Sequence, residues 1–124
     1  MTNRFRTPGY QPLRKLRVIL SGLHLAVVTD FSVAYKVILS VPVLGIAFFL
    51  RQWVDFSLIL LAMGLMLISE LFNSAIEVLC DVVEPNHHEG IRATKDIAAA
   101  AAGLSIVIWA AILTVECFRL FRSQ

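Results

Sequence analysis

The sequence predicts an all-α membrane protein with an N-terminal amphipathic surface helix and three transmembrane helices. Hydrophobic residues make up 58% of the 124 residues and charged residues only 16%, whereas soluble domains are about 45–50% apolar. The apolar residues lie in three blocks, each long enough for the ~20 residues that cross a bilayer. A basic segment that also contains leucines precedes the first block. The length fits one membrane domain, residues 1–124, without a separate soluble part.

The first expected element is a helix over about residues 11–29. Apolar residues recur along it at helical spacing, on or near one face: Leu13, Leu16, Leu20, Leu23 and Val27. Basic residues at positions 14, 15 and 17 lie in the same segment, a pattern typical of a helix in the membrane interface. The cations would hold anionic headgroups or simply anchor the helix. The alternative is a solvated basic tail.

Three transmembrane helices are expected, over about residues 31–50, 56–83 and 97–120. The first and third are close to the ~20 residues that a span needs, and the second is longer, so its last turns should project beyond the hydrocarbon. Basic residues gather before the first span and again between the second and third. The positive-inside rule then places the N-terminus and the 84–94 loop in the cytoplasm, and the C-terminus outside. Two arginines near the C-terminus argue mildly against this orientation.

The second span carries a polar stripe, which is unusual for a membrane helix. At ~100° per residue its members fall within an arc of about 100° on one face: Glu70, Asn73, Ser74, Glu77 and Asp81. A charged side chain at mid-membrane costs roughly 2.5–3.5 kcal/mol on insertion scales, so the stripe must face protein, water or a ligand. Counting ~20 residues from the start of the span puts the bilayer boundary near Ala75. The stripe would therefore join a membrane-dissolved substrate to a water-soluble one.

The loop after the second span contains Pro85 and Gly90, which predict a break between helices. Thr94 is expected to cap the third span, with Asp96 in its first turn. The position of Lys95 is then electrostatically unfavourable, because a cation at a helix N-terminus opposes the helix dipole. An anionic partner is therefore expected for it: Asp81, Glu77 or a bound phosphate.

Other features of the spans have structural interpretations. Ala99 and Gly103 form a small-xxx-small pair, which predicts close packing of the third span. Glu116, near the far end of that span, is expected to snorkel to the opposite interface and to have no role. The two cysteines lack metal-ligand spacing and are expected to be small packing residues.

The stripe and its neighbours contain the parts that phosphoryl transfer needs, although the sequence has no Gly-x-x-x-x-Gly-Lys-[Ser/Thr] loop. Glu70, partly buried, can take the proton of a hydroxyl. Asp30 would alone be an ordinary N-cap, but it can join Glu77 in holding a hard divalent cation through oxygen ligands. Lys95 can add positive charge at the phosphates. Three helices cannot enclose such a site alone, so an oligomer is expected.

Two segments resemble the prokaryotic diacylglycerol kinase family: SELFNSAIEVLCD at 69–81 and ATKDIAAAAAGL at 93–104. The family's hallmark is a Glu, then Asn-Ser-Ala-Ile-Glu, then an Asp one turn on, with Ala-Lys-Asp opening the next helix; Thr94 stands where that Ala is usual. The resemblance implies a homotrimeric kinase of the bacterial inner membrane with sites between protomers. It also implies transfer of the γ-phosphate of MgATP to a lipid hydroxyl, converting diacylglycerol to phosphatidic acid.

The resemblance implies roles for individual residues. Glu70 matches the family's catalytic carboxylate, taken as the general base, and with Ala99 is expected to contact the lipid. Glu77 matches a metal-binding Glu, and Asp30 stands where the family has a second one. The other matching polar residues of the site are Asn73, Ser74 and Asp81. Nucleotide contacts are implied for Gln11, Val18, Asn86, His87, His88, Lys95 and Asp96, although the family has an Arg near Gln11 and a Tyr near Val18.

Undecaprenol kinase, which shares these motifs and differs in its lipid acceptor, is the alternative within the family. A small ion-coupled transporter is a more distant alternative, because an intramembrane Glu is typical of one. Against it, the polar residues gather at one interface and no second span is expected to carry a matching charge. A third alternative is a noncatalytic membrane subunit whose stripe serves only assembly. A nucleic acid partner is not expected.

Overall fold

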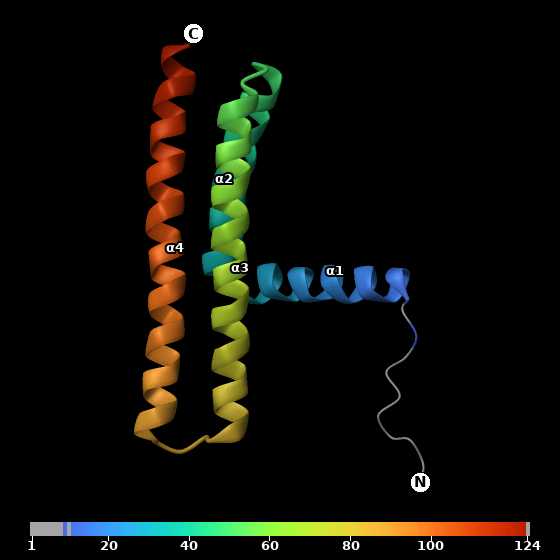
Figure 1. The fold of residues 1–124 in the computed structure, drawn as a ribbon, viewed down its shortest axis with the longest axis vertical. Coiled ribbons are helices and arrows are strands. Elements are labelled where there is room, and N and C mark those ends of the chain that lie inside the picture. The colour runs from blue at the N-terminus through green and yellow to red at the C-terminus, as the bar shows by residue number, and fades with distance from the viewer. Residues whose placement is uncertain (1–8, 10, 124) are drawn as a thin grey trace.

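The computed structural model describes residues 9 and 11–123. Four helices follow one another in these residues: α1 (Pro12–Thr29), α2 (Phe31–Phe49), α3 (Trp53–Val83) and α4 (Glu89–Arg122). The last three are each long and apolar enough to cross a membrane. They pack side by side, while α1 projects crosswise from them (Figure 1). The described residues contain no strand, so the predicted all-α fold with three candidate spans is confirmed.

The boundary between α1 and α2 is set by a capping aspartate. Pro12 stands at the start of α1, where its missing N–H costs nothing because the first N–H groups of a helix have no partner. Asp30 is extended and ends α1, and its side chain accepts a hydrogen bond from the Ser32 N–H at 2.8 Å. The chain turns there into the bundle (Figure 1). No residue of α1 is fully buried, and most of its apolar side chains are exposed, from Leu13 to Leu25 and at Val28.

A short connection closes α2 onto α3. Arg51 has a φ of 56°, a left-handed conformation that is uncommon for residues other than glycine. Trp53, the first residue of α3, meets Phe48 edge-on with ring centroids 5.5 Å apart. α3 has 31 residues and α2 has 19, which correspond to lengths of about 46 and 28 Å. The last turns of α3 therefore extend beyond the start of α2 (Figure 1).

The predicted cap of the helix that contains the third span is wrong. α4 begins at Glu89, and its cap is His88, whose Nδ1 accepts a hydrogen bond from the Gly90 N–H at 3.1 Å. Thr94, the expected cap, lies inside the helix and donates from Oγ1 to the Gly90 carbonyl at 2.9 Å. The residues after Gly90 contain no helix breaker, so the helix extends back until a side chain caps it. Pro85 does lie in the loop that separates α3 from α4.

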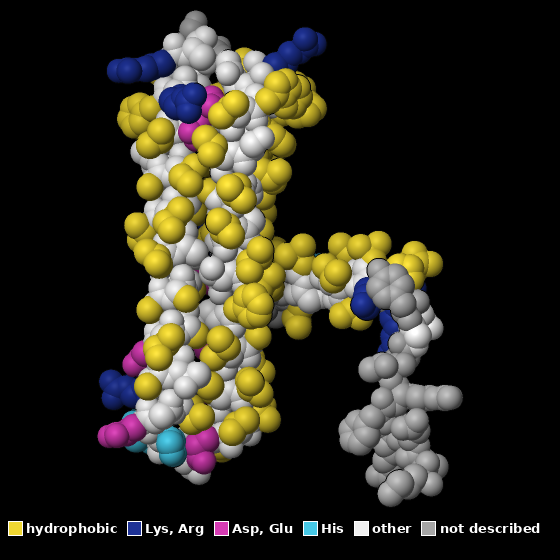
Figure 2. Space-filling view, viewed as in Figure 1, with side chains coloured by type: hydrophobic (Ala, Val, Ile, Leu, Met, Phe, Trp, Pro, Cys, Tyr) yellow, Lys and Arg dark blue, Asp and Glu magenta, His cyan; other side chains and the backbone are white. Residues whose placement is uncertain are grey.

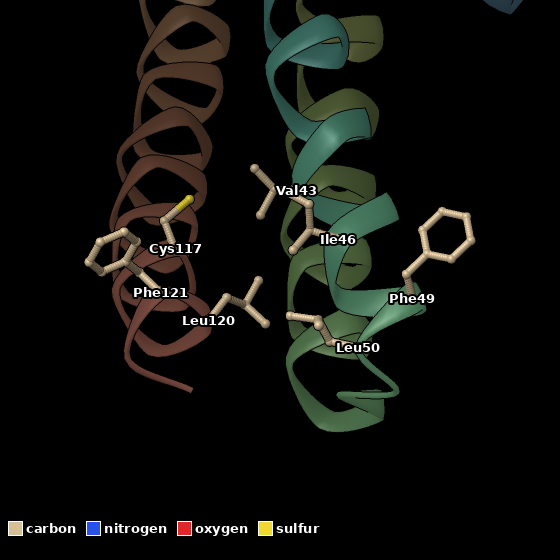
Figure 3. A pocket seen from close by; sticks show the side chains of 7 residues that line it. All are labelled: Val43, Ile46, Phe49, Leu50, Cys117, Leu120 and Phe121. Carbon is tan, nitrogen blue, oxygen red and sulfur yellow. The ribbon is translucent and has the colours of Figure 1, made fainter. Parts of the chain in front are cut away.

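Two apolar clusters hold the three long helices together. One joins α3 to α4 through Ala62, Met66 and Trp109. The other joins α2, α3 and α4 through Ala47, Ile59 and Leu120. Next to the second cluster an apolar groove lies between α2 and α4 (Figure 3), lined by Val43, Ile46, Phe49, Leu50, Cys117, Leu120 and Phe121. The groove carries no ionisable carboxylate or amine and lies away from the polar stripe.

The small residues of α4 pack differently from the prediction. Ala98 and Ala102 are the buried ones. Ala99 and Gly103 are exposed, and a side chain added at Gly103 would meet nothing within 4 Å. The close packing predicted for the Ala99–Gly103 pair is therefore not made within the described chain.

Three charged residues meet at the end of the bundle where α2 joins α3. Arg119 lies 3.2 Å from the Asp55 carboxylate and 3.4 Å from that of Glu116. Asp55 and Glu116 are 5% and 3% exposed, and Glu116 Oε2 has no hydrogen-bond partner among the described residues. The expectation that Glu116 snorkels outward is therefore wrong. Its side chain turns inward and ties the end of α4 to the start of α3.

Replacing Arg119 with Met should lower the free energy of unfolding by about 1–3 kcal/mol, because two buried carboxylates would lose their shared counter-charge. The matched control is Arg122→Met, which changes an exposed arginine in the same last turn of α4. Thermal unfolding of both variants in detergent, followed by circular dichroism, measures the effect. Equal melting temperatures for the two variants would show that the cluster contributes nothing to stability.

Candidate active site

Glu70 is buried in α3 and paired with a lysine that was not among the predicted site residues. The Glu70 side chain is 7% exposed, and its Oε1 accepts a hydrogen bond from the fully buried Lys36 ammonium of α2. Lys36 also donates to the Ser32 hydroxyl at 2.6 Å. The prediction that no second span carries a matching charge is therefore wrong. The sequence did contain the signal, because Lys36 is the only charged residue between positions 31 and 49.

A chain of hydrogen bonds links this ion pair to all three long helices. Ser40 donates from Oγ to the Lys36 carbonyl at 2.8 Å. Trp109 of α4 in turn donates from Nε1 to the Ser40 Oγ, also at 2.8 Å. Both side chains are buried, and a satisfied buried network restricts the positions of its members. The network therefore fixes Lys36, and through it Glu70, relative to α4.

The rest of the polar stripe leads from Glu70 towards the α3–α4 loop. Asn73 and Ser74 are half-buried, and Glu77 and Asp81 are exposed. The Asn73 Oδ1 atom is buried without a hydrogen-bond partner among the residues described. Such an atom calls for a partner that the single chain does not supply. The stripe thus presents a buried carboxylate at its inner end and exposed carboxylates near the loop.

A polar pocket lies where α3, the loop and α4 meet. Its lining residues are Asp81, Glu84, Pro85, Asn86, His87, His88, Ile91, Arg92, Lys95 and Asp96. Lys95 forms an ion pair with Asp81 across the two helices, which is one of the anionic partners expected for it. Acidic, basic and histidine side chains gather at this end of the bundle (Figure 2). The pocket includes every residue of the loop and of α4 that was expected to contact a nucleotide.

Asp30 lies near the height of Glu70, and Glu77 lies nearer the α3–α4 loop. α2 and α3 run in opposite directions (Figure 1), and the Lys36–Glu70 pair sets their relative height. Asp30 comes six residues before Lys36, and Glu77 seven residues after Glu70. The Lys36 ammonium reaches back to Ser32, two residues from Asp30, so Asp30 lies close to the height of the ion pair, while Glu77 lies about 10 Å from it towards the α3–α4 loop. Glu77 therefore lies between the buried Glu70 and the polar pocket, and Asp30 lies level with Glu70.

The carboxylates in this region suit a Mg²⁺ ion that also has water and phosphate ligands. They do not suit a metal ion held by protein ligands alone. Within the described residues no group of three or more His, Cys, Asp or Glu could hold a metal ion. Mg²⁺, however, is usually bound by one or two carboxylates together with waters and substrate phosphates. Asp30 and Glu77 supply that number of carboxylates. One Asp30 oxygen also caps α2, and its second oxygen is not part of that cap.

Three predicted site residues do not join this arrangement within the chain. Gln11 and Val18 are exposed at the start and in the middle of α1, which projects sideways from the bundle and away from the α3–α4 loop (Figure 1). Ala99 is exposed on the outward face of α4. A contact of Gln11 or Val18 with a ligand in the polar pocket would require a neighbouring copy of the chain.

The fold and the site together define an integral membrane protein whose spans carry a buried carboxylate next to a polar pocket. The family model described as prokaryotic diacylglycerol kinase matches residues 17–116. The chain therefore belongs to the prokaryotic diacylglycerol kinase family, which makes it a membrane lipid kinase of the diacylglycerol or undecaprenol kinase kind. The match covers the polar stripe, the loop pocket and Lys36. A comparison with curated proteins finds no match.

Proposed function

We propose that the protein transfers the γ-phosphate of ATP to the hydroxyl of a membrane lipid, with diacylglycerol as the acceptor and phosphatidic acid as the product. One observation supports this most: a buried carboxylate, Glu70, lies on the same helix face as a stripe that ends in a polar, cation-containing pocket. Such an arrangement suits a reaction between one substrate dissolved in lipid and another dissolved in water. Undecaprenol remains the alternative acceptor.

Glu70 is proposed as the general base for the acceptor hydroxyl. Its position in an apolar span suits a lipid acceptor, which can reach it from the bilayer, while a nucleotide can approach only from the loop end. A positioned base of this kind contributes about 10²–10⁴-fold to a proton transfer. The carboxylate has a hydrogen bond to Lys36 at Oε1, which leaves the other oxygen for the hydroxyl proton.

The polar pocket is proposed as the nucleotide site. Phosphoryl transfer depends mainly on positioning and on neutralising the charge of the phosphates. Lys95 and Arg92 line the pocket and would supply positive charge there, and Asn86, His87 and His88 would contact the nucleotide. Asp30 and Glu77 would hold Mg²⁺, which would neutralise phosphate charge when bound.

We further propose that the pocket faces the cytoplasm of a bacterial inner membrane and that the chain works as a homotrimer. The basic residues before α2 and between α3 and α4 favour this orientation. α1 would lie in the cytoplasmic interface, where lipid or another copy would cover its exposed apolar residues. In a homotrimer, Gln11, Val18 or Ala99 of one copy could reach the site of a neighbouring copy, although none of them reaches the site of its own chain.

The test is lipid phosphorylation by the purified protein in mixed micelles. Diacylglycerol, undecaprenol and no lipid are offered separately with radiolabelled ATP and Mg²⁺, and products are separated by thin-layer chromatography. The expected result is labelled phosphatidic acid in the diacylglycerol sample alone. Label in the undecaprenol product instead would reassign the acceptor. Absence of labelled lipid from both samples would refute the kinase proposal.

A small ion-coupled transporter is the second candidate, because one observation now favours it more than the sequence did. Lys36 gives a second span the charge that matches Glu70, and paired intramembrane charges are common in transporters. Family membership and the position of the polar pocket favour the kinase. Cation uptake into proteoliposomes without ATP, together with no lipid phosphorylation, would support the transporter instead.

A further inference from the structure

We propose that Lys36 is a positioning residue for Glu70, which keeps the carboxylate ionised and oriented within the membrane so that it can accept the proton of the lipid hydroxyl. This inference rests on the function proposed above and adds a residue to it. The carboxylate and the ammonium are 7% and 0% exposed. Neither charge is therefore stabilised by water, and each depends on the other.

Lys36 supplies the positive charge that compensates the negative charge of Glu70. α2 contains one charged residue, Lys36, between positions 31 and 49. α4, which packs against both α2 and α3, has no charged residue between positions 97 and 115. The nearest carboxylates are Asp30, beside the Ser32 turn that Lys36 reaches, and Glu77 on α3 towards the loop, and both have the same sign as Glu70. A buried carboxylate without a counter-charge takes up a proton instead of remaining ionised, and a protonated Glu70 cannot act as a base.

The contacts of Lys36 hold its ammonium in one place. Nζ donates to both Glu70 Oε1 and Ser32 Oγ, and the backbone at Lys36 is tied to Ser40 and Trp109. An ammonium has three N–H donors, so two of them are directed by fixed partners. Within the described residues, the hydrogen bonds of Glu70 engage Oε1. This arrangement leaves Oε2 to meet the acceptor.

The reaction is balanced with Lys36 unchanged. The hydroxyl proton passes to Glu70 Oε2, and the acceptor oxygen forms a bond to the γ-phosphorus while the bond from that phosphorus to the bridging oxygen of ADP breaks. Lys36 keeps its proton throughout. Glu70 afterwards passes the acquired proton to water.

Lys36→Met in the full chain tests the kinetic consequence. The variant should lower kcat for lipid phosphorylation by about 10²-fold, the lower end of what a general base contributes, while KM for ATP stays within about twofold because the polar pocket is unchanged. Ile38→Met, at an exposed position of the same helix, is the matched control and should keep the wild-type kcat. If Lys36→Met fails to assemble, Lys36→Gln is measured in its place. A wild-type kcat in the lysine variant would overturn the proposal.

Infrared spectroscopy tests the ionisation without any turnover. At neutral pH the Lys36→Met protein should show a protonated carboxylic acid C=O band in addition to any band of wild type, and this added band should be missing from the Lys36→Met, Glu70→Gln double variant. Absence of that band would overturn the role of Lys36 even if the wild type is an active kinase. An inactive wild type would instead refute the proposed function, while the infrared band would still report the ion pair. The two failures are therefore distinguishable.

Discussion

Glu70→Gln is expected to lower the rate of lipid phosphorylation by about 10²–10⁴-fold, the contribution of a positioned general base. Glutamine has nearly the same size and keeps an oxygen that can accept the hydrogen bond from Lys36, but the buried ammonium loses its counter-charge, which lowers stability. It cannot take a proton from the acceptor hydroxyl. The variant should therefore insert, assemble and bind ATP, with a lower melting temperature than wild type.

The measurement is kcat for the formation of labelled phospholipid, with size-exclusion chromatography and thermal unfolding as checks on assembly. Glu116→Gln is the matched control, because Glu116 is the other buried glutamate and lies at the end of the bundle opposite the polar pocket. The control should retain activity close to wild type. Normal turnover by Glu70→Gln would remove Glu70 from the mechanism, and an equal loss in both variants would indicate damage to the fold.

The helices were predictable because their signals are local. Apolar blocks of about twenty residues predict spans without any knowledge of neighbours, and α2, α3 and α4 contain those blocks. The end of α1 was equally predictable from the sequence, because Asp30 is a good capping residue. The start of α4 was misplaced, because an N-cap depends on which side chain reaches a free N–H. His88 reaches the Gly90 N–H, and residue type alone favoured Thr94.

The site was only half predictable, for a different reason. The polar stripe repeats at helical spacing on one helix, so its common face follows from the sequence. The partner of Glu70 is 34 residues away on α2, and a contact between helices depends on their register and rotation. A single lysine in an apolar span was nevertheless a usable signal, because such a charge requires a partner. The contact of Asp55 and Glu116 with Arg119 could not be predicted for the same reason, since it forms only when α3 and α4 pack together.

Glu77→Gln is expected to raise the Mg²⁺ concentration for half-maximal activity by about tenfold or more, because loss of a ligand or its support costs roughly 10–100-fold in metal affinity. Binding of the lipid should change much less, since Glu77 is exposed near the loop and Glu70 lies about two turns deeper. Activity is titrated with Mg²⁺ at saturating ATP and lipid. Glu89→Gln, an exposed glutamate at the start of α4, is the control for loss of one negative charge.

Asp30→Asn separates the two roles of the residue that would share the metal with Glu77. Asparagine caps helices about as well as aspartate, so the hydrogen bond from the Ser32 N–H and the thermal stability should be kept. The charge that attracts a divalent cation is lost, so the Mg²⁺ titration should shift in the same direction as for Glu77→Gln. Because both residues would bind one ion, the double variant should show less than the sum of the two free-energy effects. A shift for Glu77→Gln with none for Asp30→Asn would leave Asp30 as a helix cap alone, and an unchanged titration in both variants would rule out a metal site between them.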